Sequence, residues 1–119
     1  MLWDSLSIFL VDTIYKANLE KKNLTTGILA REFNGNRLIE FKNKEEFEEL
    51  LKKYRKIIRD RLKVFEREGL GIRKKNKEGN YEFELDGKKV MRYKIRFHNG
   101  RKWCIIIQEK NGKLTALQI

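Results

Sequence analysis

The densest charge in the sequence lies between Lys52 and Lys63, where seven basic residues accompany a single acid, Asp60. At 100° per residue, five of the seven fall on one side of a helix: Lys52, Arg55, Lys56, Arg59 and Lys63. Like charges on adjacent turns repel each other, and few acids are placed to pair with them. A solvated helix surface is the ordinary alternative, but this pattern favours a ligand that carries many negative charges.

A second group of basic residues follows directly after this segment. It contains Arg73, Lys74, Lys75 and Lys77, with Asn76 and Gly79 between segments that favour strands. This pattern predicts the tip of a basic β-hairpin, although an ordinary charged turn has the same composition. A basic helix followed by a basic hairpin would form one electropositive surface able to follow a phosphate backbone.

Composition and length limit the classes of protein that can carry this surface. The chain has 119 residues, 40% of them hydrophobic, and a formal net charge of +11, which predicts one folded domain over residues 1–119 with an anionic partner. One cysteine, Cys104, and one histidine, His98, exclude an intramolecular disulfide, a Cys/His zinc site and a nucleophile–histidine triad. We therefore expect no catalytic residue, metal or cofactor. No apolar run reaches the length of a membrane span, so we expect no membrane partner and a soluble, cytoplasmic protein.

Apolar spacing predicts three helices that position these charges, at about residues 4–19, 25–33 and 44–68. Asp4 or Ser5 can cap the first helix, and Asn43 with Glu46 resembles a capping box at the start of the third. Gly69 is placed to end the third helix in the left-handed conformation, with Leu70 contacting Phe65. The segment 37–41 is either a short strand or an extended loop.

From Leu70 onward the pattern predicts an antiparallel β meander over about residues 71–118. Its turn signals are Asp86-Gly87, Asn99-Gly100 and Asn111-Gly112. If all three turns have two residues, the strands are roughly 80–85, 88–98, 101–110 and 113–118. One face, expected to pack on the helices, then holds Met91, Tyr93, Ile95, Phe97, Cys104, Ile106 and Leu117. The other holds Phe83, Val90, Trp103, Ile105, Ile107 and Leu114 beside Arg92, Lys94 and Arg96, and a single bulge would exchange residues between the faces.

The order helix, short helix, helix and basic hairpin resembles winged-helix DNA-binding domains. The short helix opens with Leu24-Thr25-Thr26, and the strongest local similarity is Arg59-x-x-Leu62-x-x-Phe65-Glu66-x-Glu68-Gly69-Leu70-x-x-Arg73. This segment is similar to the end of the recognition helix and the first wing strand of prokaryotic and archaeal transcriptional regulators. The resemblance implies an α+β, winged helix-turn-helix fold, with three N-terminal helices followed by an antiparallel meander or wing. It also implies that the third helix reads bases in the major groove and that Arg73, Lys74, Lys75 and Lys77 hold phosphates.

The resulting hypothesis is sequence-specific binding of double-stranded DNA by a small transcriptional regulator. Arg55 and Arg59 are the candidates for base contacts, because a guanidinium can bond bidentately to guanine. Lys52, Lys56, Lys63 and the hairpin lysines would act as point charges on phosphates. The strands from Trp103 to Ile119 have apolar residues on both faces, which suggests a homodimer formed through the C-terminal strands.

Three alternatives compete with this hypothesis. Residues 37–110 also resemble RelE-like messenger-RNA-cleaving toxins, which would place catalysis on Arg92, Tyr93, Lys94 and Arg96. A protein-binding adaptor, such as a viral inhibitor, could use the same basic surface on an acidic partner. A metal-dependent nuclease would need Asp86 and Glu109, which more simply are solvated acids beside hairpin turns.

Overall fold

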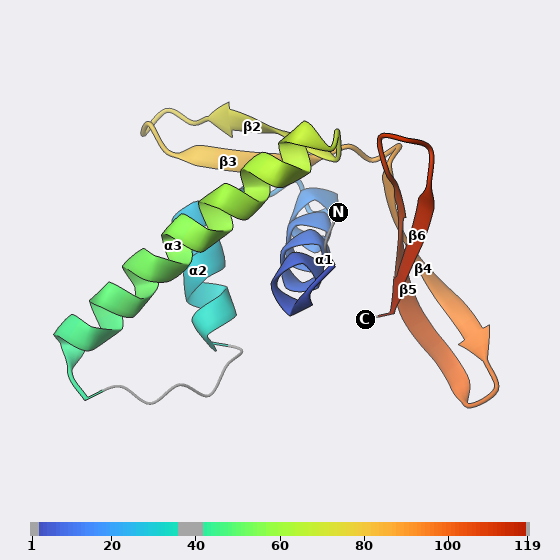
Figure 1. Ribbon diagram of the computed structural model, residues 1–119, viewed down its shortest axis with the longest axis horizontal. Helices are drawn as coiled ribbons and strands as arrows, with labels where there is room; N and C mark the ends of the chain where they lie inside the picture. The colour runs from blue at the N-terminus through green and yellow to red at the C-terminus, as the bar shows by residue number, and fades with distance from the viewer. Residues whose placement is uncertain (1–2, 36–41, 119) are drawn as a thin grey trace.

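The computed structural model describes residues 3–35 and 42–118, which form an α+β structure of three helices and two antiparallel sheets (Figure 1). In chain order the elements are α1 (Ser5–Leu19), β1 (Leu24–Thr25), α2 (Thr26–Gly35), α3 (Lys44–Arg67), β2 (Gly71–Lys75), β3 (Tyr81–Leu85), β4 (Val90–Phe97), β5 (Gly100–Gln108) and β6 (Leu114–Gln118). The three predicted helices are confirmed within two residues at each end. The helices do not all precede the strands, however, because β1 lies between α1 and α2. The expected short strand or loop at 37–41 lies outside the described residues.

Local sequence signals explain where α1 and α3 begin and end. The side chains of Asp4 and Asn43 each accept a hydrogen bond from a backbone N–H three residues later, at 2.9 Å. At the other end of α3, Gly69 has φ +76°, and the N–H of Leu70 donates to the carbonyl of Phe65 at 3.0 Å. This is the predicted glycine stop, in which the left-handed residue satisfies carbonyls that the helix leaves open.

The strands form two separate sheets, so the prediction of one continuous meander is wrong. The first sheet has the order β1-β3-β2 and the second β4-β5-β6. Because β3 is paired on both of its edges, it has no free edge for β4. After β3 the chain makes a short turn in which the N–H groups of Lys89 and Val90 both donate to the carbonyl of Asp86 at 3.0 Å. The Asp86-Gly87 signal therefore marks a change of sheet and not a two-residue hairpin.

The faces of the second sheet also differ from the prediction. Val90, Ile105 and Ile107 are fully buried, whereas Met91 and Tyr93 on the other face are 38% and 45% exposed. The expected packing face is therefore mostly the outer one, although Cys104 on this face is buried. Leu117 changes face because the loop at residues 110–112 contains one residue more than expected, with Gly112 at φ +85°, so that Leu117 pairs with Ile105.

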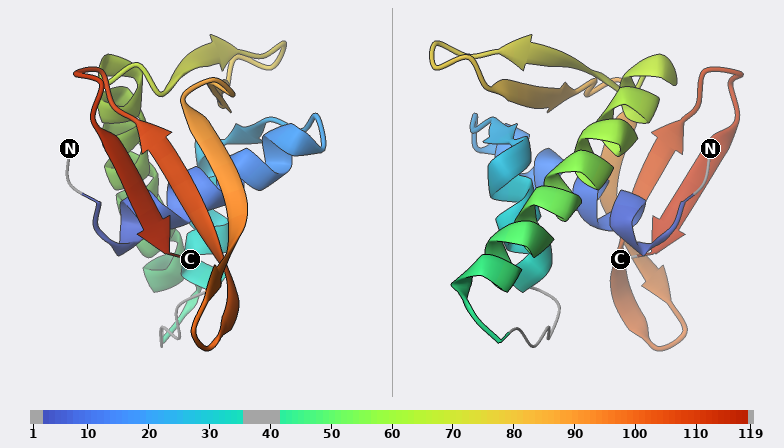
Figure 2. Two further views of the ribbon diagram at one scale, coloured as in Figure 1. Left: turned by 90° about the vertical axis from the view of Figure 1, so that its right-hand side faces the viewer. Right: turned by 60° about the vertical axis from the view of Figure 1, so that its left-hand side comes forward.

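One hydrophobic core joins both sheets to the helices. It includes residues of all three helices together with Phe83 from the first sheet and Val90, Ile105 and Ile107 from the second. Helix α1 lies between the α2–α3 pair and the second sheet (Figures 1 and 2). In the part of the chain that the structure describes, no helix is both long and apolar enough to cross a membrane.

Polar contacts fix α1 against its neighbours on both sides. Arg61 of α3 pairs with Asp4, and this contact holds the pKa of Asp4 below its ordinary value. On the opposite side, Arg92 of β4 pairs with Asp12 at 3.2 Å. The helix thus connects the two parts of the molecule that carry most of the basic charge.

Candidate nucleic-acid interface

Helix α3 presents a row of cations on the side opposite its buried residues. We call this row the α3 ridge; it consists of Lys52, Lys56, Arg59 and Lys63, all of them exposed. The helix is held to the core by Leu51, Ile58, Leu62 and Phe65. None of the four ridge residues forms an ion pair with another described residue. Their charge is therefore available to a ligand.

Arg55 was predicted to belong to the same row, but it lies on the flank of α3 and is only partly exposed. Its Nε is buried and has no hydrogen-bond partner among the described residues. A Cβ added to Gly27 at the start of α2 would lie 3.7 Å from this nitrogen, so the guanidinium packs closely beside the α2 backbone. Arg55 is thus turned away from the outer edge of the ridge.

The flank of α3 forms one wall of an open cleft of about 730 Å³. The start of α2 and the β2–β3 hairpin form the other walls, from Thr26 and Gly27 and from residues 79–83. Four cations and one acid line it: Arg55, Arg59, Lys63, Arg73 and Glu82. This balance of charge suits a phosphate group, because several cations converge while water still has access.

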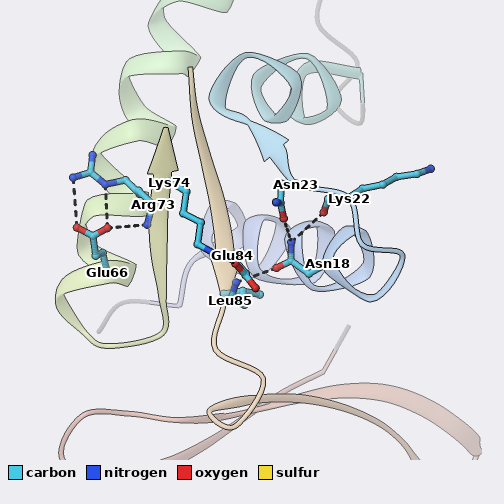
Figure 3. A network of polar contacts seen from close by, with 8 residues as sticks. All are labelled: Asn18, Lys22, Asn23, Glu66, Arg73, Lys74, Glu84 and Leu85. Atoms are coloured by element: carbon cyan, nitrogen blue, oxygen red, sulfur yellow. Dashed lines mark hydrogen bonds and ion pairs between the residues drawn. The ribbon is translucent and has the colours of Figure 1, made fainter. Parts of the chain in front are cut away.

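The predicted basic hairpin is present as β2–β3, but two of its four cations already have acidic partners (Figure 3). Arg73 lies beside Glu66 of α3, with its Nε 3.3 Å from Oε2, and Lys74 lies 2.7 Å from Glu84. The backbone N–H of Arg73 also donates to Glu66, and this bond, followed by the guanidinium, holds the pKa of Glu66 below its ordinary value. Lys75 and Lys77 are exposed without an ion pair in the described chain.

From the sequence, the cations on one face of the β4–β5 hairpin were considered only for the RNA-cleaving alternative, and they were not assigned to the nucleic-acid interface. Strand pairing places Lys94 opposite Trp103, and Arg96 opposite Arg101. Residues directly opposite each other project from the same face of a sheet. The sequence pattern already predicted that Trp103 shares a face with the basic residues of β4, and the structure adds which residues lie directly opposite each other.

The four residues suggested for an RNA-cleaving site do not all lie on one face of the sheet. Tyr93 projects from the face opposite Arg92, Lys94 and Arg96, and its hydroxyl lies 3.1 Å from the sulfur of Met91. Arg92 is occupied by Asp12. The two acids considered for a metal site are also engaged separately: Asp86 accepts from the N–H of Lys88, and Glu109 accepts from the indole N–H of Trp3. No group of three potential metal ligands occurs among the described residues.

Comparisons with protein-family models, with curated proteins and with solved structures find no match for this chain. The assignment of a function therefore depends on the geometry and charge described above.

Proposed function

We propose that this protein binds double-stranded DNA and acts as a small transcriptional regulator, with the α3 ridge in the major groove. The observation that carries the proposal is the row of four exposed cations without ion pairs, two of which also line a cleft together with Arg55 and Arg73. From Lys52 to Lys63 the ridge extends over about 16 Å at 1.5 Å per residue. The major groove, about 12 Å wide, admits a helix of this kind.

The arrangement of the elements is consistent with the resemblance to winged-helix domains. Helix, short helix, helix and hairpin follow one another in the expected order, and the β2–β3 hairpin lies beside the second half of α3 (Figure 1). A duplex lying along the ridge would place one sugar–phosphate strand near the cleft between α3 and the hairpin. In this proposal the hairpin is the wing.

The exposure and the partners of the basic residues support a division of roles among them. Arg59 is exposed on the ridge and is the candidate for reading a guanine. Arg55 and Arg73 line the cleft and are held by the protein, so we assign them to a backbone phosphate. Positive charge without sequence preference would come from Lys52, Lys56, Lys63, Lys75 and Lys77. Lys74 would contribute less to binding, because it contacts Glu84.

A homodimer formed through the C-terminal strands is part of the proposal. Strand β6 is an edge strand of five residues without a charged side chain, whereas the other edge, β4, carries three cations. Unprotected edges favour pairing with another strand. Two copies would join through β6 without bringing like charges together, and such a dimer would match a two-fold symmetric operator.

The proposal is tested by titrating labelled duplexes with the protein at several salt concentrations and measuring fluorescence anisotropy. The variant Lys52→Ala/Lys56→Ala should bind every duplex more weakly, and the slope of log affinity against log salt should fall by roughly 1.8, at about 0.9 per phosphate contact. Arg59→Ala should instead reduce the preference among sequences. On a palindromic duplex the end point should correspond to two chains.

The matched control is Lys110→Ala/Lys113→Ala, which removes the same charge from an exposed loop of the second sheet. Its affinity for duplexes should stay close to that of the parent. Equal losses in the two double variants would show that only net charge matters. Absence of saturable binding to any duplex at low salt would overturn the proposal.

A further inference from the structure

The distal half of the β4–β5 hairpin is the most strongly basic part of the molecule outside α3. Residues 90–108 contain five cations and no acid. The hairpin extends beyond β6 and beyond the end of α1, so that its tip is separate from the body of the molecule (Figures 1 and 2). Apart from Arg92, which pairs with Asp12, none of these cations forms an ion pair with another described residue.

One face of the hairpin changes character from the core to the tip. Val90, Ile105 and Ile107 are fully buried where α1 covers the sheet. Arg92 and Trp103 follow at the boundary, and the face ends with Lys94, Arg96 and Arg101, all exposed. We call the exposed part, formed by Lys94, Arg96, Arg101 and Trp103, the Trp103 face.

Trp103 is held in place although it is 40% exposed. The guanidinium carbon of Arg92 lies 4.0 Å from the centroid of the indole ring, and Nζ of Lys94 lies 5.6 Å from it. Arg92 is itself fixed by Asp12, with both side chains less than one-fifth exposed. The indole thus lies against the guanidinium of Arg92 with the Lys94 ammonium nearby, while 40% of Trp103 remains in contact with solvent.

Near the tip of the hairpin, Arg96 lies directly opposite Arg101. Like charges directly opposite each other destabilise a strand pair, and no acid among the described residues pairs with either of them. A polyanion would relieve this repulsion. Two guanidinium groups next to an exposed aromatic ring suit a ligand in which negative charges and flat rings alternate.

We propose that the Trp103 face binds single-stranded nucleic acid. An unpaired base stacks on the indole of Trp103, and the adjoining phosphates lie against Lys94, Arg96 and Arg101. A single strand fits this face better than a duplex, because only an unpaired base offers its flat surface to an aromatic side chain. The site is distinct from the α3 ridge and does not depend on duplex binding.

The first experiment measures binding of a labelled oligothymidylate of about twelve nucleotides by fluorescence anisotropy. Trp103→Leu keeps an apolar residue in the strand but removes the stacking surface, and the affinity should fall about tenfold. Arg96→Ala/Arg101→Ala should cause a loss of similar size and reduce the salt dependence. The matched control Lys110→Ala/Lys113→Ala removes two charges from the opposite end of the same sheet and should change the affinity less than twofold.

The second experiment observes Trp103 directly. In Trp3→Phe, Trp103 is the only tryptophan, and oligothymidylate should quench its fluorescence, whereas inorganic polyphosphate should bind without quenching. If Trp3→Phe does not fold, the anisotropy of the parent and of Trp103→Leu remains decisive. An oligouridylate in the same titration distinguishes DNA from RNA as the source of the strand.

Several outcomes would overturn the inference. Unchanged affinity of Trp103→Leu for oligothymidylate would show that the indole does not stack. A loss of affinity for duplexes alone in Arg96→Ala/Arg101→Ala would also exclude the inference. That result would mean that this face binds duplexes more tightly than single strands. The variant Lys52→Ala/Lys56→Ala separates the two proposals, because it should bind single strands like the parent whether or not the ridge binds duplexes.

Discussion

The two basic hairpins of this protein differ in how their charge is balanced. Residues 71–85, which contain β2 and β3, include four cations and three acids, and Glu66 of α3 supplies a fourth acid beside them. Residues 90–108, which contain β4 and β5, include five cations and no acid. From the sequence, the first hairpin was assigned to phosphate contacts, but the second hairpin carries the larger net charge.

The hairpins also differ in how they are attached. Arg73 and Glu66 connect the first hairpin to α3 through a contact in which both side chains remain partly exposed. Arg92 and Asp12 connect the second hairpin to α1, and these side chains are only 17% and 12% exposed. Cations that have internal partners help to position the hairpins, whereas cations without partners are fully available to a ligand. A run of lysines and arginines in a sequence does not distinguish these two uses.

The largest effect that we expect is a loss of stability when Asp12 is replaced. Asp12→Asn removes the negative charge opposite the guanidinium of Arg92 in a nearly buried position, so the free energy of unfolding should fall by about 2 kcal/mol. Glu66→Gln breaks the more exposed contact of the first hairpin and should cost only about 0.5 kcal/mol. Urea unfolding of both variants measures the difference. Equal losses would mean that the two attachments are equivalent.

A smaller effect is expected from releasing the cations of the first hairpin. In Glu66→Gln/Glu84→Gln, Arg73 and Lys74 lose their acidic partners, so affinity for duplexes should rise about threefold at low salt and the salt slope should steepen by roughly 1 to 2. The control Glu20→Gln/Glu32→Gln removes two exposed acids elsewhere. Weaker binding in the first variant would show that the acids orient the cations for phosphate and do not merely neutralise them.

The helices could be predicted from the sequence because their signals are local. Asn43, Gly69 and the spacing of apolar residues each act within one or two turns, and all three signals are confirmed. The cationic row on α3 follows from the same periodicity. Arg55 is the exception, because its position on the flank is decided by contact with the α2 backbone, which is distant in sequence.

The sheets could not be predicted in the same way because their partners are not local. The first sheet depends on β1, a strand of two residues that gives no periodic signal but fills the edge of β3. In the second sheet both faces contain apolar residues, so the pattern does not indicate which face packs on α1. One additional residue in the loop at 110–112 then moved Leu117 to the other face. The Trp103 face depends on the same cross-strand register.

The smallest expected effect is the response of the first hairpin to acid. The pKa of Glu66 is lowered, first by the backbone N–H of Arg73 and then by its guanidinium. A carboxyl group whose pKa is lowered by folding stabilises the folded state. This stabilisation is fully present at pH values above the ordinary glutamate pKa of about 4.3, and it is lost as the pH falls through the lowered pKa. Because the Glu66 carboxylate is partly exposed, we expect a loss of only about 0.5 kcal/mol.

The amide resonance of Arg73, followed by NMR during an acid titration, reports this transition directly, because that N–H lies 3.0 Å from the Glu66 carboxylate. Its midpoint should lie below the ordinary pKa of a glutamate side chain, and the transition should disappear in Glu66→Gln. A midpoint at or above the ordinary value would show that the carboxylate is not engaged by Arg73 in solution. The cation would then be free, and the contrast between a balanced hairpin and an unbalanced one would no longer hold.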